Sequence, residues 1–541
     1  MIIKEFSKEL LLKNSKQTED SIILIQQFFI PQDIQRYKEI KDALQKNIEN
    51  PHLSKIYLLN ERIYSNEELD VSSNKIVQVN LQKRMSFKDV FDFVESENIQ
   101  GYIVFSNSDI EIDTSIYKLN YTNISNEKQL LCLTRYEKNG NIIISINNKK
   151  FSRSCQDTWI YHSNFNVKEK NREIFDYFFG VPGCDNKLLY LFKILGYQII
   201  NASIKIKTFH HHKSITREYS FNRIERPYYF SIPYGLYDRT LSTSNFSDNN
   251  KLYHYIFEKL NKNECFIIPR VGGIENNIVY RYYKLIEEYK NNKNRFENTN
   301  LGIYYSDYLL HRFKNNAGIV LKSLEDVRIY SKLYLESFKN SEMYCVWDKN
   351  GYVYHKTHEV VLEKFQKDTI WAFTLDIYHY IHLEPWTLSL KGKKILIISS
   401  FVETIREKVK IREKIYNIDL FPECEFIFLK PPQTHGNNKS RVFHEELNDF
   451  IIEIKKIKNN FDVALVSSGG NGNLICNELF KMNKSSIYIG GVLQMYFGIY
   501  GERWLKERPD IMKLYKNEFW SRPKDEEKPK NYKNVEDSCY W

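Results

Sequence analysis

Residues 101–109 read Gly-Tyr-Ile-Val-Phe-Ser-Asn-Ser-Asp, and this stretch decides the expected fold. Its apolar part predicts a short buried strand, and Asn107 and Asp109 follow that strand directly. Other apolar runs and segments of helical spacing alternate before it, at residues 22–29, 32–48, 55–60, 76–79 and from 86 onward. This alternation favours a parallel, Rossmann-like sheet, in which ligands bind at the carboxyl ends of the strands. We therefore expect Asn107 and Asp109 to lie at the edge of a ligand site.

The second half of the chain repeats the α/β pattern after a change in composition. Residues 221–250 contain prolines and a run of Ser, Thr, Asn and Asp, which is typical of a boundary between domains. Three strand–glycine junctions follow, at residues 265–275, 461–472 and 486–491. We expect a first domain at residues 1–220, a linker at 221–250 and a second domain at 251–520. A loosely held, charged tail is expected at residues 521–541.

The composition of the chain indicates which binding partners and which cellular compartment to expect. The 541 residues carry a formal net charge of +10, which favours anionic partners such as nucleotide phosphates, nucleic acid or acidic lipids. Basic and acidic residues are interleaved, so a solvated surface is favoured over a nucleic-acid patch. The eight cysteines show no metal-ligand spacing and predict free thiols in a reducing, cytoplasmic compartment. No run of 18 apolar residues predicts a membrane span.

The first candidate site is a metal site. Asp109 is the candidate ligand for Mn²⁺ or Mg²⁺, because hard cations prefer oxygen ligands. Asn107 can hydrogen-bond a ribose or act as a weak ligand. His210 and His212 alternate along a predicted strand and therefore share a face, so one of them can complete the metal shell. The alternatives are an Asx turn that ends the strand and a solvated cluster of histidines.

Two further acidic positions can carry chemistry. Asp185 opens a predicted helix, where its carboxylate can act as a general base or simply cap the helix. Asp157 stands beside Trp159, and sugars stack their apolar faces on such aromatic rings. The alternative is a core Trp with Asp157 in a turn.

Two glycine turns in the second half can cradle phosphate through backbone N–H groups. Residues 270–275 read Arg-Val-Gly-Gly-Ile-Glu, and residues 467–472 read Ser-Ser-Gly-Gly-Asn-Gly. Neither turn has P-loop spacing, so ordinary tight turns are the alternative.

On these residues, the segment 20–220 resembles inverting, family-2-like glycosyltransferases of the A fold, in the divergent forms found in large DNA viruses and algae. Residues 107–109 stand at the DxD position of that fold, with Asn in place of the first Asp. Asp185 stands at the position of its catalytic base, and His210 and His212 at its last metal or diphosphate contact. The resemblance implies nucleotide contacts at Asn60, Glu61 and Arg84.

The segment 250–510 resembles the D-fold glycosyltransferases, in which an Arg-x-Gly-Asp-Gly-Glu-like motif follows the first strand. Here that motif is residues 270–275, and Gly273 replaces the metal-binding Asp. The resemblance implies a catalytic role for Glu275 and donor contacts at Arg270, Gly469 and Gly470.

Together these resemblances imply a bifunctional glycosyltransferase in the cytoplasm, with the host-cell cytoplasm or the virion as specific locations. It would transfer a hexosyl or deoxyhexosyl group from a nucleotide-diphosphate sugar to a glycan or glycoprotein, with inversion in the first domain. A divalent cation, Mn²⁺ or Mg²⁺, would be held in that domain by Asp109, His210 and His212. Asp185 and Asp157 would be its catalytic carboxylates, with Asn107 and Trp159 at the donor. The alternative is a basic nucleic-acid-binding or structural protein built on decayed transferase domains.

Overall fold

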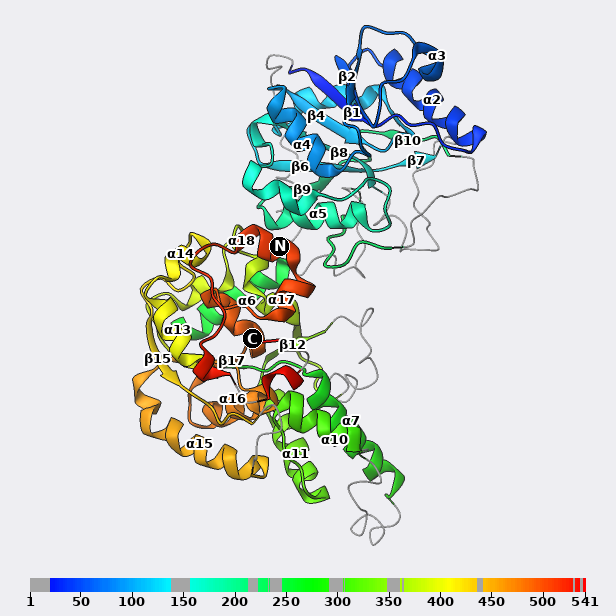
Figure 1. Ribbon diagram of the computed structural model, residues 1–541. Coiled ribbons are helices and arrows are strands. Elements are labelled where there is room, and N and C mark those ends of the chain that lie inside the picture. The colour runs from blue at the N-terminus through cyan, green and yellow to red at the C-terminus, as the bar shows by residue number, and fades with distance from the viewer. Residues whose placement is uncertain are drawn as a thin grey trace. The chain divides into compact units, whose positions relative to one another are not determined.

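The computed structural model describes most of the chain in two compact units, Met1–Ser244 and Asn245–Trp541, here called unit 1 and unit 2 (Figure 1). Both units are mixed α/β bodies with parallel-rich, Rossmann-like sheets, as the alternating pattern predicted. The sequence also predicts a strand at residues 142–146, and these lie outside the described residues. The described residues are 20–137, 156–212, 222–231, 233, 246–290, 305, 307–347, 361, 364–434, 441–528, 531–535 and 539–541.

Unit 1 is built on a seven-stranded sheet in the order β3-β2-β1-β4-β8-β6-β9. Strands β1 to β4 run parallel to one another, β8 is antiparallel to both its neighbours, and β9 is parallel to β6. The carboxyl ends of β1, β2 and β4 therefore meet at one edge of the sheet. The strands are β1 (Ile22–Gln26), β2 (Lys55–Asn60), β3 (Ile76–Asn80), β4 (Tyr102–Ser106), β6 (Gln129–Thr134), β8 (Gln156–His162) and β9 (Gln198–Asn201).

A small second sheet of unit 1, in the order β5-β10-β7, brings distant parts of the chain together. Strand β10 (Thr208–His210) is antiparallel to β5 (Ile110–Ile112) and parallel to β7 (Tyr136–Glu137). The register places His210 opposite Ile110. As a result, the histidines near residue 210 lie beside the turn that follows β4.

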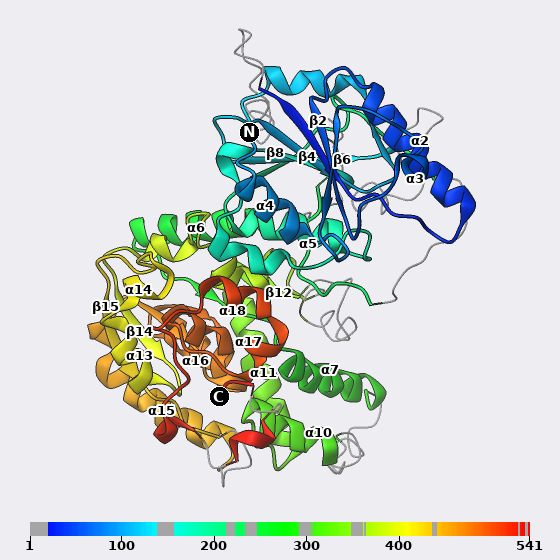
Figure 2. The same cartoon turned by 45° about the horizontal axis from the view of Figure 1, so that its top comes forward.

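Helices α2, α3 and α4 of unit 1 begin where side chains cap their first amides, whereas α5 begins after Gly183 without a side-chain cap. Asp33 accepts hydrogen bonds from the backbone N–H groups of Gln35 and Arg36, and Ser86 with Asp89 forms a capping box. Helices α2 and α3 lie close together (Figure 2), and the hydroxyl of Tyr37 in α2 donates a hydrogen bond to the carbonyl of Glu68 in α3. The helices are α2 (Ile34–Glu49), α3 (Asn66–Leu69), α4 (Phe87–Ser96) and α5 (Cys184–Ile194).

Unit 2 is built on a five-stranded, fully parallel sheet in the order β11-β17-β16-β14-β15. The chain places β15 on one side of β14 and then crosses to β16 on the other side. A topological switch point therefore lies between β14 and β16, where open α/β sheets bind their ligands. The strands are β11 (Ile267–Ile268), β14 (Lys394–Ile398), β15 (Glu425–Leu429), β16 (Val463–Val466) and β17 (Ser485–Tyr488), and β12 (Met343–Val346) pairs with β13 (Asp368–Trp371) separately.

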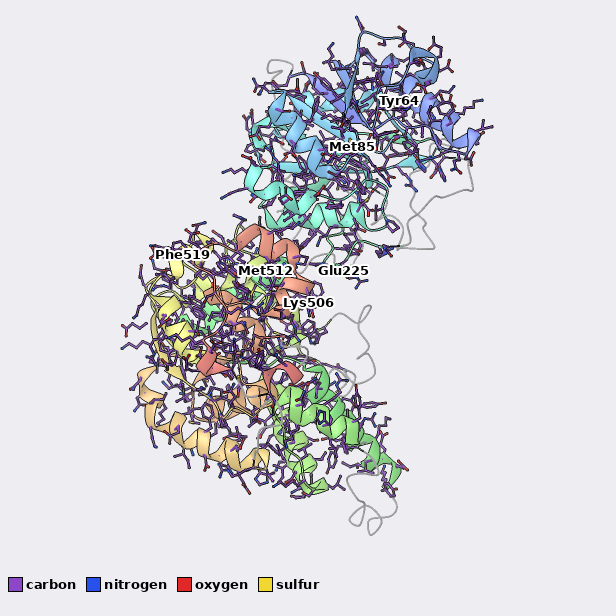
Figure 3. All side chains as sticks on the ribbon, viewed as in Figure 1. Tyr64, Met85, Glu225, Lys506, Met512 and Phe519 are labelled. Carbon is purple, nitrogen blue, oxygen red and sulfur yellow. The ribbon has the colours of Figure 1, made fainter. Side chains whose placement is uncertain are left out.

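The core of unit 2 lies between this sheet and its helices. Helix α11 contacts both α7 and α16, and the buried side chains Val279, Tyr334 and Leu474 belong to one apolar cluster. Three of the side chains labelled in Figure 3 are buried: Met512 in unit 2, and Tyr64 and Met85 in unit 1. The helices are α6 (Phe246–Asn261), α7 (Gly273–Glu288), α10 (Asp307–Arg312), α11 (Leu324–Asn340), α13 (Val402–Val409), α14 (Arg412–Tyr416), α15 (Phe443–Ile457), α16 (Gly472–Lys481), α17 (Glu502–Glu507) and α18 (Pro509–Tyr515).

The described residues of the segment 521–541 pack onto unit 2, so our expectation of a loosely held tail is wrong. Glu527 is only 2% exposed, and its carboxylate accepts hydrogen bonds from the backbone N–H groups of Glu403 and Thr404 at the start of α13. Trp541 is also buried and packs against Phe401. The charged composition was misleading because one of the acidic residues is a buried helix cap.

Candidate functional site

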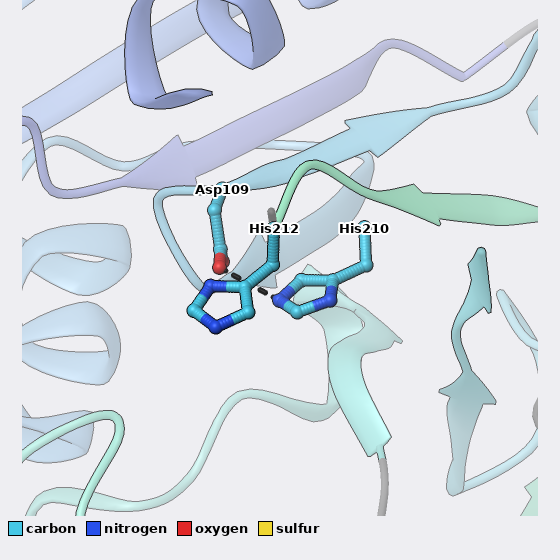
Figure 4. Close-up of side chains that lie close together, drawn as sticks. All are labelled: Asp109, His210 and His212. Carbon is cyan, nitrogen blue, oxygen red and sulfur yellow. Dashed lines mark hydrogen bonds and ion pairs between the residues drawn. The ribbon is translucent and has the colours of Figure 1, made fainter. Parts of the chain in front are cut away.

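Asp109, His210 and His212 form a cluster of candidate metal ligands in unit 1 (Figure 4). One ligand atom from each residue lies within 4.8 Å of the others. Nε2 of His210 is 2.8 Å from the carboxylate of Asp109, and the rings of His210 and His212 are stacked with centroids 5.0 Å apart. The two histidines therefore share a face, as their alternation predicted, and the pairing of β10 with β5 brings them to Asp109.

Two residues of α2, Arg36 and Glu39, join this cluster. Nη1 of Arg36 lies 2.7 Å from the carboxylate of Asp109, 2.9 Å from Nδ1 of His212 and 3.4 Å from the carboxylate of Glu39. Glu39 is 4% exposed, whereas Ile34, an apolar residue of the helical pattern at residues 32–48, is 84% exposed. A charged pair spaced i, i+3 is typical of a solvated helix surface. Nothing in the local pattern therefore distinguished Arg36 and Glu39 as site residues.

The charges in the cluster shift the ionisation of its members. Burial opposes the charge of Asp109, but the contacts with His210 and Arg36 outweigh it and hold the pKa of Asp109 below its ordinary value. Burial also opposes the charge of His210, yet hydrogen bonds to Asp109 and Glu137 raise the pKa of His210 to about 9. Burial, together with the charges of His210 and Arg36, lowers the pKa of His212. The cluster thus contains an ionised carboxylate beside one charged and one neutral imidazole.

The donor set fits a divalent cation. A buried carboxylate and two imidazoles are ligands that Mn²⁺ and related first-row cations accept, and binding would displace the proton of His210. His212 is already neutral, and its Nδ1 accepts a hydrogen bond from Arg36. Arg36 would compete with a bound cation for Oδ2 of Asp109 and Nδ1 of His212.

A second polar group joins the end of β4 to the start of β8. The side-chain amide of Asn107 donates to the carboxylate of Asp157 over 2.7 Å, and that carboxylate also forms an ion pair with Arg135. The amide N–H of Asn107 is therefore directed to Asp157. Arg135 is a further residue that sequence reasoning missed, because a single Arg after a strand carries no signal.

Asp185 lies in the first turn of α5, where it is partly buried. Burial raises the pKa of this carboxyl to about 7, and the nearby charge of Asp157 adds to the effect, while Arg135 opposes it. Asp185 and Asp157 are therefore close enough to influence each other electrostatically. A carboxyl with a pKa near neutrality has the ionisation that a general base requires.

The three residues expected to contact a nucleotide occupy different environments. Asn60 is fully buried: its side-chain oxygen accepts from the backbone N–H of Phe28, and its amide donates to Gln78. Asn60 therefore supports the sheet and cannot reach a ligand, contrary to our expectation. Glu61 accepts a hydrogen bond from Gln27 over 3.0 Å. Arg84 donates to the carbonyl of Phe179, which places it beside the loop that leads to Asp185.

Trp159 is not a platform for a sugar, contrary to our expectation. Its exposed fraction is 0%, and its ring packs against Phe87, Phe105 and Phe179. The indole belongs to the core because it points from β8 into a layer of aromatic side chains. Sequence alone left a core Trp and a ligand platform as equal alternatives.

Unit 2 contains a cavity of about 360 Å³ that is lined by residues following β11, β14, β16 and β17. Arg270, Glu275 and Gly469 line it, as the motifs predicted. Gly470 is not part of the lining: its carbonyl accepts from Tyr330, and a side chain there would meet Ile319 at 2.6 Å. Gly470 therefore packs against the core, and its expected role in donor binding stays a prediction.

Several lining residues were not singled out from the sequence. They come from loops and from the end of the chain, where no periodic pattern marks them. They include Trp347, Asp376, Arg508 and Tyr540.

Comparisons with known proteins reveal only distant similarity. No protein-family model matches the chain, and no curated protein matches it. Among solved structures, a glycosyltransferase from Streptococcus sanguinis shares 11% identity with a TM-score of 0.28, over 51% of this chain and 94% of the other. A mannosyltransferase from Pyrobaculum calidifontis, in complex with GDP-mannose and Mn²⁺, shares 9% identity with a TM-score of 0.26, over 48% of this chain and 69% of the other. Within the described residues, no helix is both long and apolar enough to cross a bilayer.

Proposed function

We propose that the protein is a glycosyltransferase and that unit 1 transfers a sugar from a nucleotide-diphosphate donor to a glycan or glycoprotein acceptor. The observation that carries this proposal is the position of the Asp109–His210–His212 cluster. It follows β4 at an edge of the sheet where parallel strands end, and the carboxylates of Asp157 and Asp185 belong to the same unit. The A-fold resemblance of residues 20–220 accounts for the order of these parts.

In this proposal, Asp109, His210 and His212 would hold Mn²⁺ or Mg²⁺. A bound cation would neutralise charge on the diphosphate leaving group. The cluster fits this role because Asp109 stays ionised and His212 stays neutral.

Asp185 would take the proton of the acceptor hydroxyl as that oxygen attacks the anomeric carbon. Attack from the face opposite the diphosphate inverts the configuration of the sugar. The carboxyl of Asp185 is partly ionised at neutral pH because its pKa is about 7. Asp157, held by Asn107 and Arg135, would help to raise that pKa.

Unit 2 would be a second transferase domain of the D-fold type, which makes the protein bifunctional. Its cavity lies where strands of a parallel sheet end, and it includes Arg270 and Glu275. We further propose a cytoplasmic location, since the seven described cysteines are all free thiols.

A thermal-shift panel of nucleotide sugars, with and without Mn²⁺, tests the proposal. A ligand that binds only the folded state raises the apparent stability. We expect a nucleotide diphosphate or its sugar to raise Tm only when Mn²⁺ is present, and Asp109→Ala to remove that dependence. No response to any nucleotide, together with oligonucleotide binding that falls steeply with salt, would instead favour the nucleic-acid-binding alternative.

A further inference from the structure

The cavity of unit 2 is lined by several arginines at the switch point of its sheet. Arg270 follows β11, and Arg503 and Arg508 come from α17 and the residue after it. Ser399 and Ser467, at the ends of β14 and β16, form the part of the wall nearest the switch point. The cavity volume of about 360 Å³ is within the range of small-molecule sites.

Three guanidinium groups act on one buried carboxyl in this wall. Asp376 is 7% exposed and accepts a hydrogen bond from the hydroxyl of Tyr378 over 2.8 Å. Burial raises the pKa of Asp376, while the charges of Arg508, Arg270 and Arg503 oppose that shift. These arginines therefore converge on the same region of the cavity. The other acidic lining residues are Glu275 and Glu507, and Glu507 is exposed and lies 3.7 Å from Arg503.

Arg270 is held in place by its surroundings. Its guanidinium lies against the rings of Trp347 and Tyr488, 5.6 Å and 5.4 Å from their centroids, and Nη1 donates to the carbonyl of Ile489. Its Nε is buried and makes no hydrogen bond. A Cβ at Gly490, where φ is +75°, would lie 2.3 Å from Nη2 of Arg270. Gly490, which follows β17, therefore leaves room for the guanidinium of Arg270, and the fold fixes the position of this group.

The aromatic side chain of Tyr540 forms another part of the wall. It lies 5.0 Å from the guanidinium of Arg503, and its hydroxyl accepts a hydrogen bond from that residue over 3.3 Å. A Cβ at Gly491 would lie 2.1 Å from the ring of Tyr540. Both glycines after β17 thus accommodate lining side chains.

The carboxylates of this cavity do not form a metal site. Within the described residues, the one group of three or more potential ligands whose atoms cluster is Asp109, His210 and His212 in unit 1. Asp376 is instead hydrogen-bonded to Tyr378, and Gly273 stands where the D-fold motif carries its metal-binding Asp. These residues therefore do not form a D-fold site that depends on a cation.

We propose that this cavity binds a phosphate-bearing anion directly through Arg270, Arg503 and Arg508, without a divalent cation. Arginine suits this role because its planar fork of N–H donors matches phosphate oxygens. The phosphate-bearing nature of the ligand rests on the proposed transferase activity of unit 2. The three guanidinium groups would take the place of the expected cation as a fixed positive charge.

The test measures binding of inorganic pyrophosphate by calorimetry to the full chain carrying Asp109→Ala, which removes the metal-ligand carboxylate of unit 1. We expect binding to persist in EDTA. Arg270→Met, Arg503→Met and Arg508→Met should each weaken it about tenfold, the usual effect of losing a hydrogen bond to a charged group. Arg328→Met, an exposed arginine of the same unit that pairs with Glu325, is the matched control and should leave binding unchanged.

Melting curves of each variant separate loss of binding from loss of folding. If Arg270→Met does not fold, the pyrophosphate binding of Arg503→Met and Arg503→Lys tests the inference instead. These variants are suitable because the side chain of Arg503 is 30% exposed. Binding that disappears in EDTA, or that ignores all three arginines, overturns the inference. Pyrophosphate binding without any sugar transfer by unit 2 would leave the anion site standing and remove only the proposed second transferase activity.

Discussion

The guanidinium of Arg36 lies 2.7 Å from the carboxylate of Asp109, so a positive side chain already occupies the region where a cation bound to Asp109 would lie. The same nitrogen is 2.9 Å from Nδ1 of His212. Two of the three candidate ligands therefore contact Arg36 in this structure. A cation bound to Oδ2 of Asp109 or to Nδ1 of His212 would compete with Arg36 for that atom.

The first prediction is that Arg36→Met strengthens Mn²⁺ binding. The variant removes a competing positive charge, and we expect the Kd for Mn²⁺ to fall about tenfold, the scale of one charge-assisted hydrogen bond. Electron paramagnetic resonance of free Mn²⁺ measures the affinity directly. Lys46→Met, an exposed substitution on the same helix, is the control. Unchanged or weaker Mn²⁺ binding by Arg36→Met would show that the cation and the guanidinium do not compete.

The second prediction concerns catalysis by Asp185. Asp185→Asn keeps the size of the side chain but removes its basicity. Transfer should fall about a hundredfold or more, the usual contribution of general-base catalysis, while the donor still binds. In the unsubstituted protein the rate should rise with pH through about 7, as the carboxyl loses its proton. Full activity in the variant, or a rate that is flat across neutral pH, would remove Asp185 from the mechanism.

The third prediction is a pH dependence of stability from the same residue. The folded-state pKa of Asp185 is raised from 3.8 to about 7, so the folded state holds this proton more tightly than the unfolded state. Its contribution to stability is therefore full below pH 3.8 and is lost as the pH rises to about 7. Relative to the unsubstituted protein, Asp185→Asn should become more stable across that window. Urea denaturation at several pH values measures this, with the exposed Asp42→Asn as control; parallel curves for all three proteins would contradict the shift.

The fourth prediction concerns the end of the chain. Glu527 accepts hydrogen bonds from the first backbone amides of α13, and its loss would leave buried N–H groups without an acceptor. Glu527→Ala should lower the free energy of unfolding by about 1–3 kcal/mol. The neighbouring Glu526 is exposed, so Glu526→Ala should have no measurable effect. Equal melting temperatures for the two variants would restore the expectation of a loosely held tail.

The fifth prediction concerns the independence of the two units. The chain divides between Ser244 and Asn245, and each unit has its own sheet. A fragment ending at residue 244 should therefore fold and bind a nucleotide donor with Mn²⁺, and the fragment from 245 should fold by itself. Circular dichroism and melting curves check this. If both fragments are insoluble, the two units do not fold separately.

Local patterns in the sequence predicted much of the secondary structure around the sites. The strand at β2 has the predicted bounds, and β4 ends at Ser106, directly before Asn107, as its apolar run required. Local patterns succeed here because a buried strand needs consecutive apolar residues. The alternation of His210 and His212 also predicted their common face, which the structure shows although β10 ends at His210.

Which polar residues gather at each site, and which aromatic residues are buried, depends on the packing of segments that are distant in the sequence. Arg36 and Glu39 resemble a surface pair in sequence, yet the packing of α2 buries Glu39 beside Arg36 and leaves Ile34 exposed. Trp159 resembles a ligand platform, yet three phenylalanines from other segments enclose it. The gathering of Arg270, Arg503 and Arg508 around Asp376 likewise depends on segments more than a hundred residues apart in sequence. Burial and ion pairing arise between segments that the fold brings together, so no local pattern of residues encodes them.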